Sequence, residues 1–247
     1  MVTVETRGSV AVLTLDRAAR RNALGTESMR VLSAALRDAD ADPAVRVIVL
    51  TGAPPAFCAG SDLKELGGLS IPAMCDHEAE TAAVVRGIGF LSKPVVAAVE
   101  GYALGGGFIL AVSCDVVVSA ENVRWHLAEV TNGWLPVWGL QALTARVGPV
   151  RARLLTWGAE PIDGREALRL GVADYDAPAG GALDRAMAVA DGLARLPAEA
   201  VVSAKRFFEP FVMADAERLD SVASRMFARD CESSAAQATL SRFTVTK

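Results

Sequence analysis

Two glycine-containing turns in this sequence leave main-chain N–H groups free to bind an anionic oxygen. The first lies in the stretch FCAGSDLKEL, which runs from Phe57 to Leu66 and opens a short helix ended by Gly67. The second is GYALGGGFIL at residues 101–110, where three consecutive glycines precede an expected helix. The first amides of a helix have no partner within it, and the helix dipole favours negative charge there. Two such turns lying side by side would clamp one oxygen.

The triple glycine has other interpretations. A nucleotide-binding loop is disfavoured because Gly105–Gly107 matches neither the motif GxGxxG nor the motif GxxxxGK[ST]. A purely structural role, in which the glycines permit close packing of a strand on a helix, fits the triple glycine taken alone. The argument for an oxygen clamp therefore depends on both turns together.

Glu129 is the main candidate for acid–base chemistry. It lies in the stretch HLAEV, and its apolar neighbours include Leu127, Val130 and Trp134. Burial without a partner raises the pKa of a carboxyl group towards the range useful for proton transfer. A surface position is the alternative for such a residue. His126 is expected to pack or make a hydrogen bond rather than take part in catalysis.

A cluster of polar residues follows the first glycine turn. Its members are Asp76, His77, Glu78 and Glu80. Their crowding within one segment suits the solvated side of a helix better than a closed metal coordination shell. We therefore expect no metal site here, and His77 is expected to be solvated.

Composition limits the class of protein. The 247 residues are 52% hydrophobic, enough to bury a full core in one domain. A net charge of −4 with scattered basic residues disfavours a nucleic-acid partner. The start MVTVETRGSV does not resemble a signal peptide, and no apolar run approaches the ~20 residues that span a bilayer. The four cysteines lack CxxC spacing, which indicates reduced thiols. We expect a soluble cytoplasmic protein with no membrane partner.

The first half of the chain alternates short β-branched runs with helical patterns. Strands are expected at Val10–Leu15, Val45–Thr51, Val95–Glu100 and Asp115–Ser119. Met29, Leu32 and Leu36 recur at helical spacing after the first strand, with Thr26 as the expected helix cap. Strand, helix and strand in succession imply parallel crossovers and an α/β core.

The second half is predominantly helical. Helices are expected at Gly139–Val147, Val150–Trp157, Gly164–Leu170, Ala182–Leu193, Ala198–Phe208, Asp215–Ala228 and Glu232–Phe243. The last three carry many phenylalanines, which need a partner surface on the same core or on another subunit. We therefore divide the chain into a core, residues 1–195, and a helical oligomerisation region, residues 196–247.

The order and spacing of these motifs resemble the crotonase superfamily of enoyl-CoA hydratases and isomerases. FCAGSDLKEL is followed by EGYALGGGF and then by LAEVTNGWLP. An early turn, Arg21-Asn22-Ala23-Leu24, is similar to the family's acyl-CoA-contacting turn, and GREALRLGVAD at residues 164–174 is similar to another family segment. The resemblance covers the chain from Val10 to Phe243.

The resemblance implies a fold, a substrate and a set of roles. It implies stacked β-β-α turns, a helical C-terminal trimerisation region, and homotrimers or dimers of trimers. The substrate is an acyl-CoA thioester, with coenzyme A arriving as part of it and no separate cofactor. The peptide N–H groups of Ser61 and Gly106 form the implied oxyanion hole, and Glu129 is the implied catalytic residue. The implied substrate-binding residues are Arg21, Ala23, Leu24, Ala59, Gly60, Asp62, Leu63, Gly105, Ile109, Trp134, Pro136 and Trp138. Asp62 is also expected to cap the helix that follows it.

One departure from the family pattern affects the chemistry. Where two-glutamate hydratases have their first catalytic glutamate, this chain has Ile109, which cannot move a proton. A single glutamate beside an oxyanion hole suffices to shift a double bond, so the sequence favours the isomerases of the family. The segment Pro136-Val137-Trp138 is similar to one in those isomerases, and Trp138 would narrow the pocket and displace water.

Three alternatives stay open. The first is an enoyl-CoA hydratase, or a specialised decarboxylase or carbon–carbon bond-forming member, in which another group replaces the missing glutamate. The second is a non-catalytic acyl-CoA-binding protein, with which Ile109 is compatible and against which Glu129 argues. A nucleic-acid-binding role is the third, and the acidic charge balance disfavours it.

Overall fold

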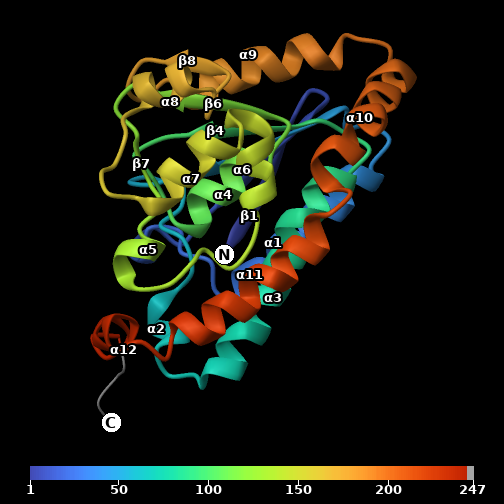
Figure 1. Cartoon of the computed structure of the whole chain (residues 1–247). Helices are drawn as coiled ribbons and strands as arrows, with labels where there is room; N and C mark the ends of the chain where they lie inside the picture. Colours follow the sequence, from blue (N-terminus) through green and yellow to red (C-terminus); the bar gives the residue numbers. More distant parts are fainter. Residues whose placement is uncertain (244–247) are drawn as a thin grey trace.

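A six-stranded sheet forms the centre of the protein in the computed structural model, which describes residues 1–243 (Figure 1). Its strand order is β1-β2-β3-β4-β6-β8. β1 runs antiparallel to β2, and the other neighbouring pairs are parallel. The strands are β1 (Val2–Arg7), β2 (Val10–Leu15), β3 (Val47–Gly52), β4 (Val95–Val99), β6 (Val116–Ala120) and β8 (Tyr175–Ala177). The predicted strands and their parallel crossovers are confirmed, with small shifts at their ends.

Beyond the main sheet, a shorter row of paired strand segments leads the chain to the glycine turns. Its two strands, β5 (Tyr102–Leu104) and β7 (Arg124–His126), run parallel to each other. Single bridges extend the row, including one between Leu24 and Ser61 and one between Cys58 and Ala103. β4 and β6 are each followed by a short strand, β5 or β7, and then by a helix, as in stacked β-β-α turns.

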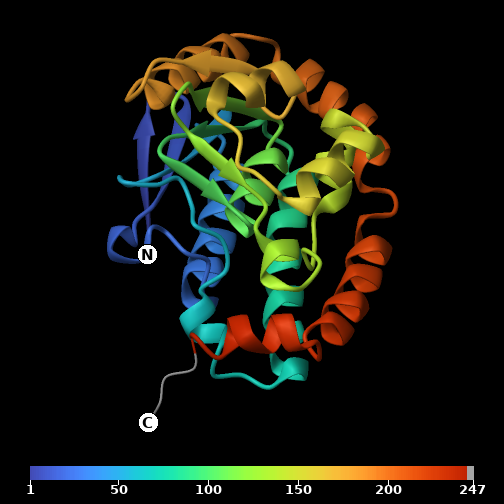
Figure 2. The same cartoon turned by 60° about the vertical axis from the view of Figure 1, so that its left-hand side comes forward.

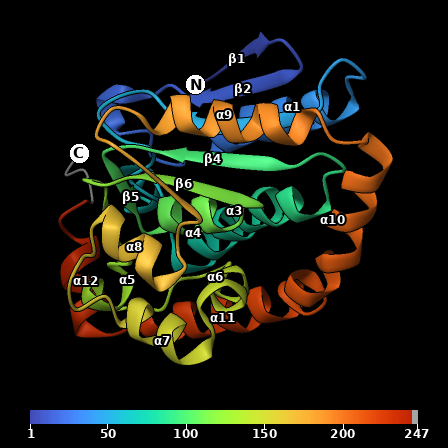
Figure 3. The ribbon, with the colours of Figure 1, turned by 90° about the horizontal axis from the view of Figure 1, so that it is seen from above.

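The helices lie on both sides of the main sheet. They are α1 (Thr26–Ala41), α2 (Leu63–Leu66), α3 (Ile71–Phe90), α4 (Gly106–Val112), α5 (Glu129–Asn132), α6 (Leu140–Val147), α7 (Pro149–Trp157), α8 (Gly164–Leu170), α9 (Ala182–Ala194), α10 (Ala198–Met213), α11 (Ala216–Asp230) and α12 (Ser234–Leu240), with a 3-10 turn at Ala18–Arg20. In Figure 3, α9 runs alongside β4 on the near side of the sheet, and α3 and α4 lie on the far side.

The start of α1 corrects one prediction. Thr26 is the first helical residue rather than the cap, which is Gly25 in an extended conformation. Ser28 Oγ accepts a hydrogen bond from the Gly25 amide, and the Thr26 hydroxyl instead donates to Glu65 Oε1 at 2.5 Å. The predicted cap at Asp62 is confirmed, because its side chain accepts a hydrogen bond from the Lys64 amide at the start of α2. Asp163 caps α8 by accepting a hydrogen bond from the Glu166 amide.

The C-terminal helices fold back along the core. α10 contacts α3 and α6, α11 packs along α3, and α12 contacts α5 (Figure 2). The two halves of the chain therefore meet beside the glycine turns, which brings C-terminal side chains within reach of the candidate site. Within residues 1–243, no helix is long and apolar enough to cross a membrane.

Candidate active site

A cavity of about 200 Å³ lies where the two glycine turns meet α3, α5 and the loop before α6. Most of the predicted site residues line it. They are Ala59, Gly60, Ser61, Leu63, Gly105, Gly106, Ile109, Glu129, Trp134, Pro136 and Trp138. Residues of α2, α4 and α5 and of the loops before α2, α4 and α6, distant in sequence, thus contribute to one small space.

The two glycine turns are in direct contact. A Cβ atom added to Gly60, whose φ is +87°, would lie 2.8 Å from the Leu104 carbonyl and 3.1 Å from the Gly106 nitrogen. The backbones approach this closely because no side chain separates them. The bridge to Leu24 uses the Gly60 carbonyl and the Asp62 amide, which leaves the Ser61 amide free. Among the described residues, neither the Ser61 nor the Gly106 amide has a main-chain acceptor.

Glu129 enters the cavity from the first residue of α5. Its Oε1 lies 2.7 Å from the position that a Cβ on Gly105 would occupy, so the triple glycine also makes room for the carboxylate. Its Oε2 is buried and has no hydrogen-bond partner among the described residues. Burial raises the pKa of Glu129 to about 7, and the charge of Glu78 adds to the rise. The carboxyl group can therefore hold or release a proton near neutral pH.

Glu78 is a second carboxylate in this cavity, and sequence reasoning missed it. The prediction of a solvated helix side was wrong here, because Glu78 is only 3% exposed. It lies one turn from Met74 and one turn from Ala82 on α3, and all three are buried. That four-residue spacing was the available signal, since residues at i and i+4 share a helix face.

His77 was also predicted to be solvated, and that prediction was wrong. It is 7% exposed because α3 is packed against α1 on one side and α11 on another. Its ring nitrogens lie 3.9 Å from a carboxylate oxygen of Glu65 and of Glu78, beyond hydrogen-bond distance. No cluster of three or more His, Cys, Asp or Glu side chains within residues 1–243 is placed to hold a metal ion.

Trp138 forms one wall of the cavity. Its Nε1 donates a 2.6 Å hydrogen bond to Glu78 Oε2, and its ring edge would lie 3.0 Å from a Cβ on Gly106. Ile109, which is 1% exposed, adds an apolar surface beside it. The bond to Trp138 fixes one oxygen of Glu78, whereas Glu129 Oε2 stays unpaired.

The C-terminal helices contribute to the site. Phe227 of α11 lines the cavity and packs edge-on against Trp134, with ring centroids 6.2 Å apart. Leu240 of α12 lines it as well. Phe243 does not line the cavity and lies beside Gly67 at the end of α2, where a Cβ on Gly67 would come within 3.0 Å of the Phe243 Cβ.

Several predicted site residues do not line the cavity. Asp62 is engaged in capping α2 and in a 3.0 Å ion pair with Arg17. Arg21 lies with its guanidinium 5.9 Å from the centre of the Tyr102 ring. Ala23 and Leu24 are buried in the turn that pairs with Ser61.

His126 lies outside the cavity as well. Its Nε2 is 2.7 Å from the Gly158 carbonyl oxygen, which agrees with the expectation of a structural hydrogen bond.

Comparison with known proteins agrees with this arrangement. The sequence matches the profile of the enoyl-CoA hydratase/isomerase family over residues 5–246. A probable enoyl-CoA hydratase from Rhizobium meliloti is 37% identical over 203 residues, covering 82% of this chain and 78% of that protein. The 2,3-dehydroadipyl-CoA hydratase of Escherichia coli is 36% identical over 199 residues, covering 80% and 77%.

The fold is shared with solved structures too. A putative enoyl-CoA hydratase from Mycobacterium avium paratuberculosis superposes with a TM-score of 0.89 at 28% identity, over 98% of this chain and 96% of that one. The family profile spans both glycine turns, Glu129 and the C-terminal helices that close the cavity. The chain therefore belongs to the enoyl-CoA hydratase/isomerase family.

Proposed function

We propose that this enzyme moves the double bond of a 3-enoyl-CoA to give a 2-enoyl-CoA, with Glu129 as both base and acid. The observation that carries the proposal is the carboxyl group of Glu129, buried, unpaired at Oε2 and with a pKa of about 7. The carboxylate takes a proton from the carbon next to the thioester carbonyl, and the electron pair spreads into a dienolate. The resulting carboxylic acid returns the proton two carbons further along the chain, which restores Glu129 for the next cycle.

The amides of Ser61 and Gly106 stabilise the dienolate in this proposal. Both belong to residues that line the cavity, and the Gly60 and Gly106 backbones are in contact. A thioester oxygen bound between them gains negative charge as the proton leaves, and fixed N–H donors stabilise that charge. The hydroxyl group of Ser61 has no part in the step.

Isomerisation needs fewer catalytic groups in the cavity than hydration does. Water addition needs a bound water, a base to activate it and a proton donor, whereas isomerisation needs one group that moves one proton. Ile109 offers no hydrogen bond to a water, and the indole of Trp138 occupies space beside Gly106. A narrow, largely apolar cavity of about 200 Å³ favours the reaction that excludes water.

Hydration of a 2-enoyl-CoA is the second candidate, and one observation favours it. Glu78 places a second carboxylate in the cavity from a different helix than the one that carries Ile109. The relatives reported above are also named as hydratases. Glu78 would then hold the water while Glu129 exchanges the proton.

A product assay separates the two reactions. Purified enzyme is offered a 3-enoyl-CoA and a 2-enoyl-CoA, in water and in D₂O. Isomerisation leaves the mass unchanged in water, produces the absorbance of a conjugated thioester, and exchanges hydrogen for deuterium. Hydration adds the mass of one water. Rapid water addition to the 2-enoyl-CoA without isomerisation would refute our first choice, and tight binding without any product would indicate a non-catalytic member.

We further propose that α10 contributes to an interface between copies of the chain, as the predicted trimer or dimer of trimers requires. Phe207, Phe208 and Phe211 are each more than 60% exposed, at 67%, 63% and 75%, and their rings contact one another. Exposed aromatic clusters are typical of interfaces. Light scattering on Phe211→Ser should report a smaller assembly than the unmodified chain, and an unchanged mass would contradict this interface.

A further inference from the structure

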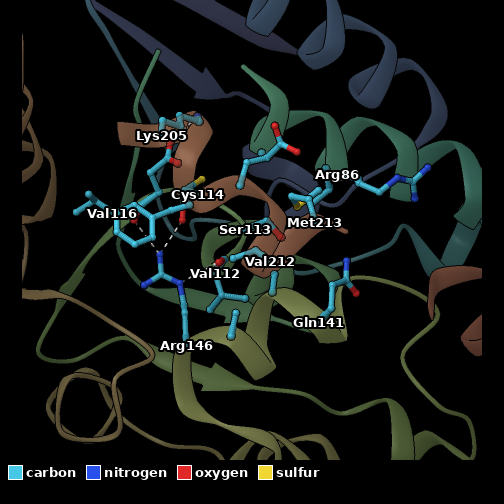
Figure 4. Close-up of a pocket in the computed structure, with 18 of the residues that line it drawn as sticks. Arg86, Val112, Ser113, Cys114, Val116, Gln141, Arg146, Lys205, Val212 and Met213 are labelled. Carbon is cyan, nitrogen blue, oxygen red and sulfur yellow. Dashed lines mark hydrogen bonds and ion pairs between the residues drawn. The ribbon is translucent and has the colours of Figure 1, made fainter. Parts of the chain in front are cut away.

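A second and larger cavity lies behind the candidate active site, enclosed by α3, α4, α6 and α10 (Figure 4). Its volume is about 470 Å³, against about 200 Å³ for the catalytic cavity. Small and branched apolar side chains provide much of its lining, among them Val85, Val112, Ala142, Ala204 and Val212. A space of this size and polarity is suited to an apolar ligand.

The cationic side chains around this second cavity are already engaged. Lys205 Nζ lies 2.7 Å from Asp115 Oδ2, and Arg86 Nη1 lies 2.6 Å from Asp220 Oδ2. Arg146 donates to the carbonyl oxygens of Val112 and Cys114, as the dashed lines in Figure 4 show. An anionic ligand would have to break one of these pairs. An aliphatic chain would not.

Trp138 separates the two cavities. Among the described residues, it alone lines both of them. Its indole is held on the catalytic side by the hydrogen bond to Glu78. On the other side, the amide of the next residue, Gly139, donates a 2.9 Å hydrogen bond to Asp220. One buried carboxylate thus fixes the indole, and a second one, on a different helix, fixes the backbone next to it.

We propose that Trp138 is a partition that determines acyl-chain length: it ends the catalytic cavity at short acyl groups and closes off an apolar space that would accept the distal part of a long aliphatic chain. This inference rests on the proposed function, because it takes an acyl-CoA as the occupant of the catalytic cavity. The enzyme as it stands therefore selects short acyl groups, and shortening residue 138 joins the two spaces.

Binding of saturated acyl-CoA thioesters tests the partition without turnover. Dissociation constants of butanoyl-CoA and decanoyl-CoA are measured by calorimetry for the unmodified enzyme and for Trp138→Ala. The unmodified enzyme should prefer butanoyl-CoA. Each methylene newly buried strengthens binding by about fourfold. In Trp138→Ala, the preference should therefore shift towards decanoyl-CoA by more than about tenfold.

Two controls distinguish the partition from a general loosening of the site. Phe227→Ala removes an aromatic ring that lines the catalytic cavity and not the apolar one, so it should leave the ratio of the two dissociation constants near that of the unmodified enzyme. Adding Ala142→Phe to Trp138→Ala refills the apolar cavity from α6 and should reverse the gain. Should Trp138→Ala fail to fold, Trp138→Leu opens a smaller passage and should give a smaller shift.

The outcomes separate this inference from the function on which it rests. If no variant binds either thioester, the acyl-CoA substrate itself is wrong. If butanoyl-CoA binds but Trp138→Ala gains nothing for decanoyl-CoA, the partition is refuted and the proposed function is unaffected. An equal gain in Phe227→Ala would likewise refute the partition, because that side chain does not line the second cavity.

Discussion

The two cavities that meet at Trp138 differ in how their polar groups are satisfied. In the smaller one, Glu129 Oε2 is buried without a partner, and the amides of Ser61 and Gly106 have no main-chain acceptor among the described residues. In the larger one, Arg86 and Lys205 are ion-paired, and one buried amide oxygen, Gln141 Oε1, has no partner among the described residues. The smaller cavity thus keeps an unpaired carboxylate oxygen and two amides without an acceptor that a substrate can use. The larger one offers mainly apolar surface, with no buried titratable group left unpaired in the described part of the chain.

This difference indicates which cavity does the chemistry, and volume alone would have indicated the wrong one. A buried polar group without a hydrogen bond is destabilising, typically by about 1–3 kcal/mol. Such a group is tolerated where a ligand supplies the missing hydrogen bond, and groups with perturbed pKa values are concentrated at functional sites. Paired charges at the rim of the larger cavity instead stabilise the packing of α3 against α11.

The largest expected effect comes from removing the proton-transferring group of the smaller cavity. Glu129→Gln keeps the shape of the side chain and loses its titration. We expect kcat/KM for the 3-enoyl-CoA to fall by about 10²–10⁴, the usual contribution of a positioned acid–base group. Steady-state assays with matched binding measurements check this, because affinity for butanoyl-CoA should fall much less than turnover. A loss of only a few fold would remove Glu129 from its proposed role.

Substitutions at the larger cavity should change the stability of the protein rather than its catalytic activity. Asp220→Ala leaves Arg86 without its carboxylate partner in a largely buried position, and we expect the free energy of unfolding to fall by about 3 kcal/mol. The matched control is Asp215→Ala, which removes a carboxylate whose pair with Arg218 is exposed at 65% and 64%. That variant should lose less than about 1 kcal/mol. Urea denaturation measures both, and equal losses would contradict a structural role for the Arg86–Asp220 pair.

The pH dependence of activity sharpens the contrast between the two carboxylates of the smaller cavity. As a base, Glu129 must be ionised, so kcat/KM should rise with pH and level off above about 7. Glu78→Gln removes a like charge and keeps an oxygen that can accept from Trp138. Burial, the larger cause of the raised pKa of Glu129, remains in this variant. The rising part of the pH profile should therefore move to lower pH, and activity at pH 6 should rise by less than about tenfold.

The opposite result would be equally informative. A fall of more than about 100-fold in kcat/KM in Glu78→Gln at all pH values would identify Glu78 as a second proton-transferring group, and it would favour hydration over isomerisation.

The raised pKa of Glu129 also affects folding. A carboxyl group that holds its proton more tightly when folded stabilises the protein below its unfolded pKa, and this contribution is lost as pH rises through about 7.

The glycine turns and strands β2, β3, β4 and β6 were predicted because local sequence determines them, whereas β1 and β8 were not predicted. Val95–Val99 is a valine-rich apolar run, and the triple glycine further along marks the start of α4. Strands β5 and β7 were not predicted, since three residues carry no measurable periodicity and their pairing is set by the stacking of the long strands.

The partners of the site residues were less accessible to sequence reasoning. The bond between Trp138 and Glu78 joins residues 60 positions apart, and the contact between Trp134 and Phe227 joins α11 to the loop before α6. Such contacts depend on how α3 and α11 pack, which local patterns do not fix. Sequence therefore predicted most of the groups that line the smaller cavity and left open which groups hold them.

The smallest effect is expected at His126, which lies three residues before Glu129 and outside both cavities. Its ring nitrogen bonds to the Gly158 carbonyl, and Gly158 has a positive φ of +59° where α7 ends. His126→Gln should lower the free energy of unfolding by about 1 kcal/mol, the worth of one such hydrogen bond, and change kcat/KM by less than about threefold. Its pH profile should match that of the unmodified enzyme, since the rising part belongs to Glu129. If the rising part of the pH profile moved in His126→Gln, the loop between β7 and α5 would couple His126 to the pKa of Glu129. His126 would then not be a purely structural residue.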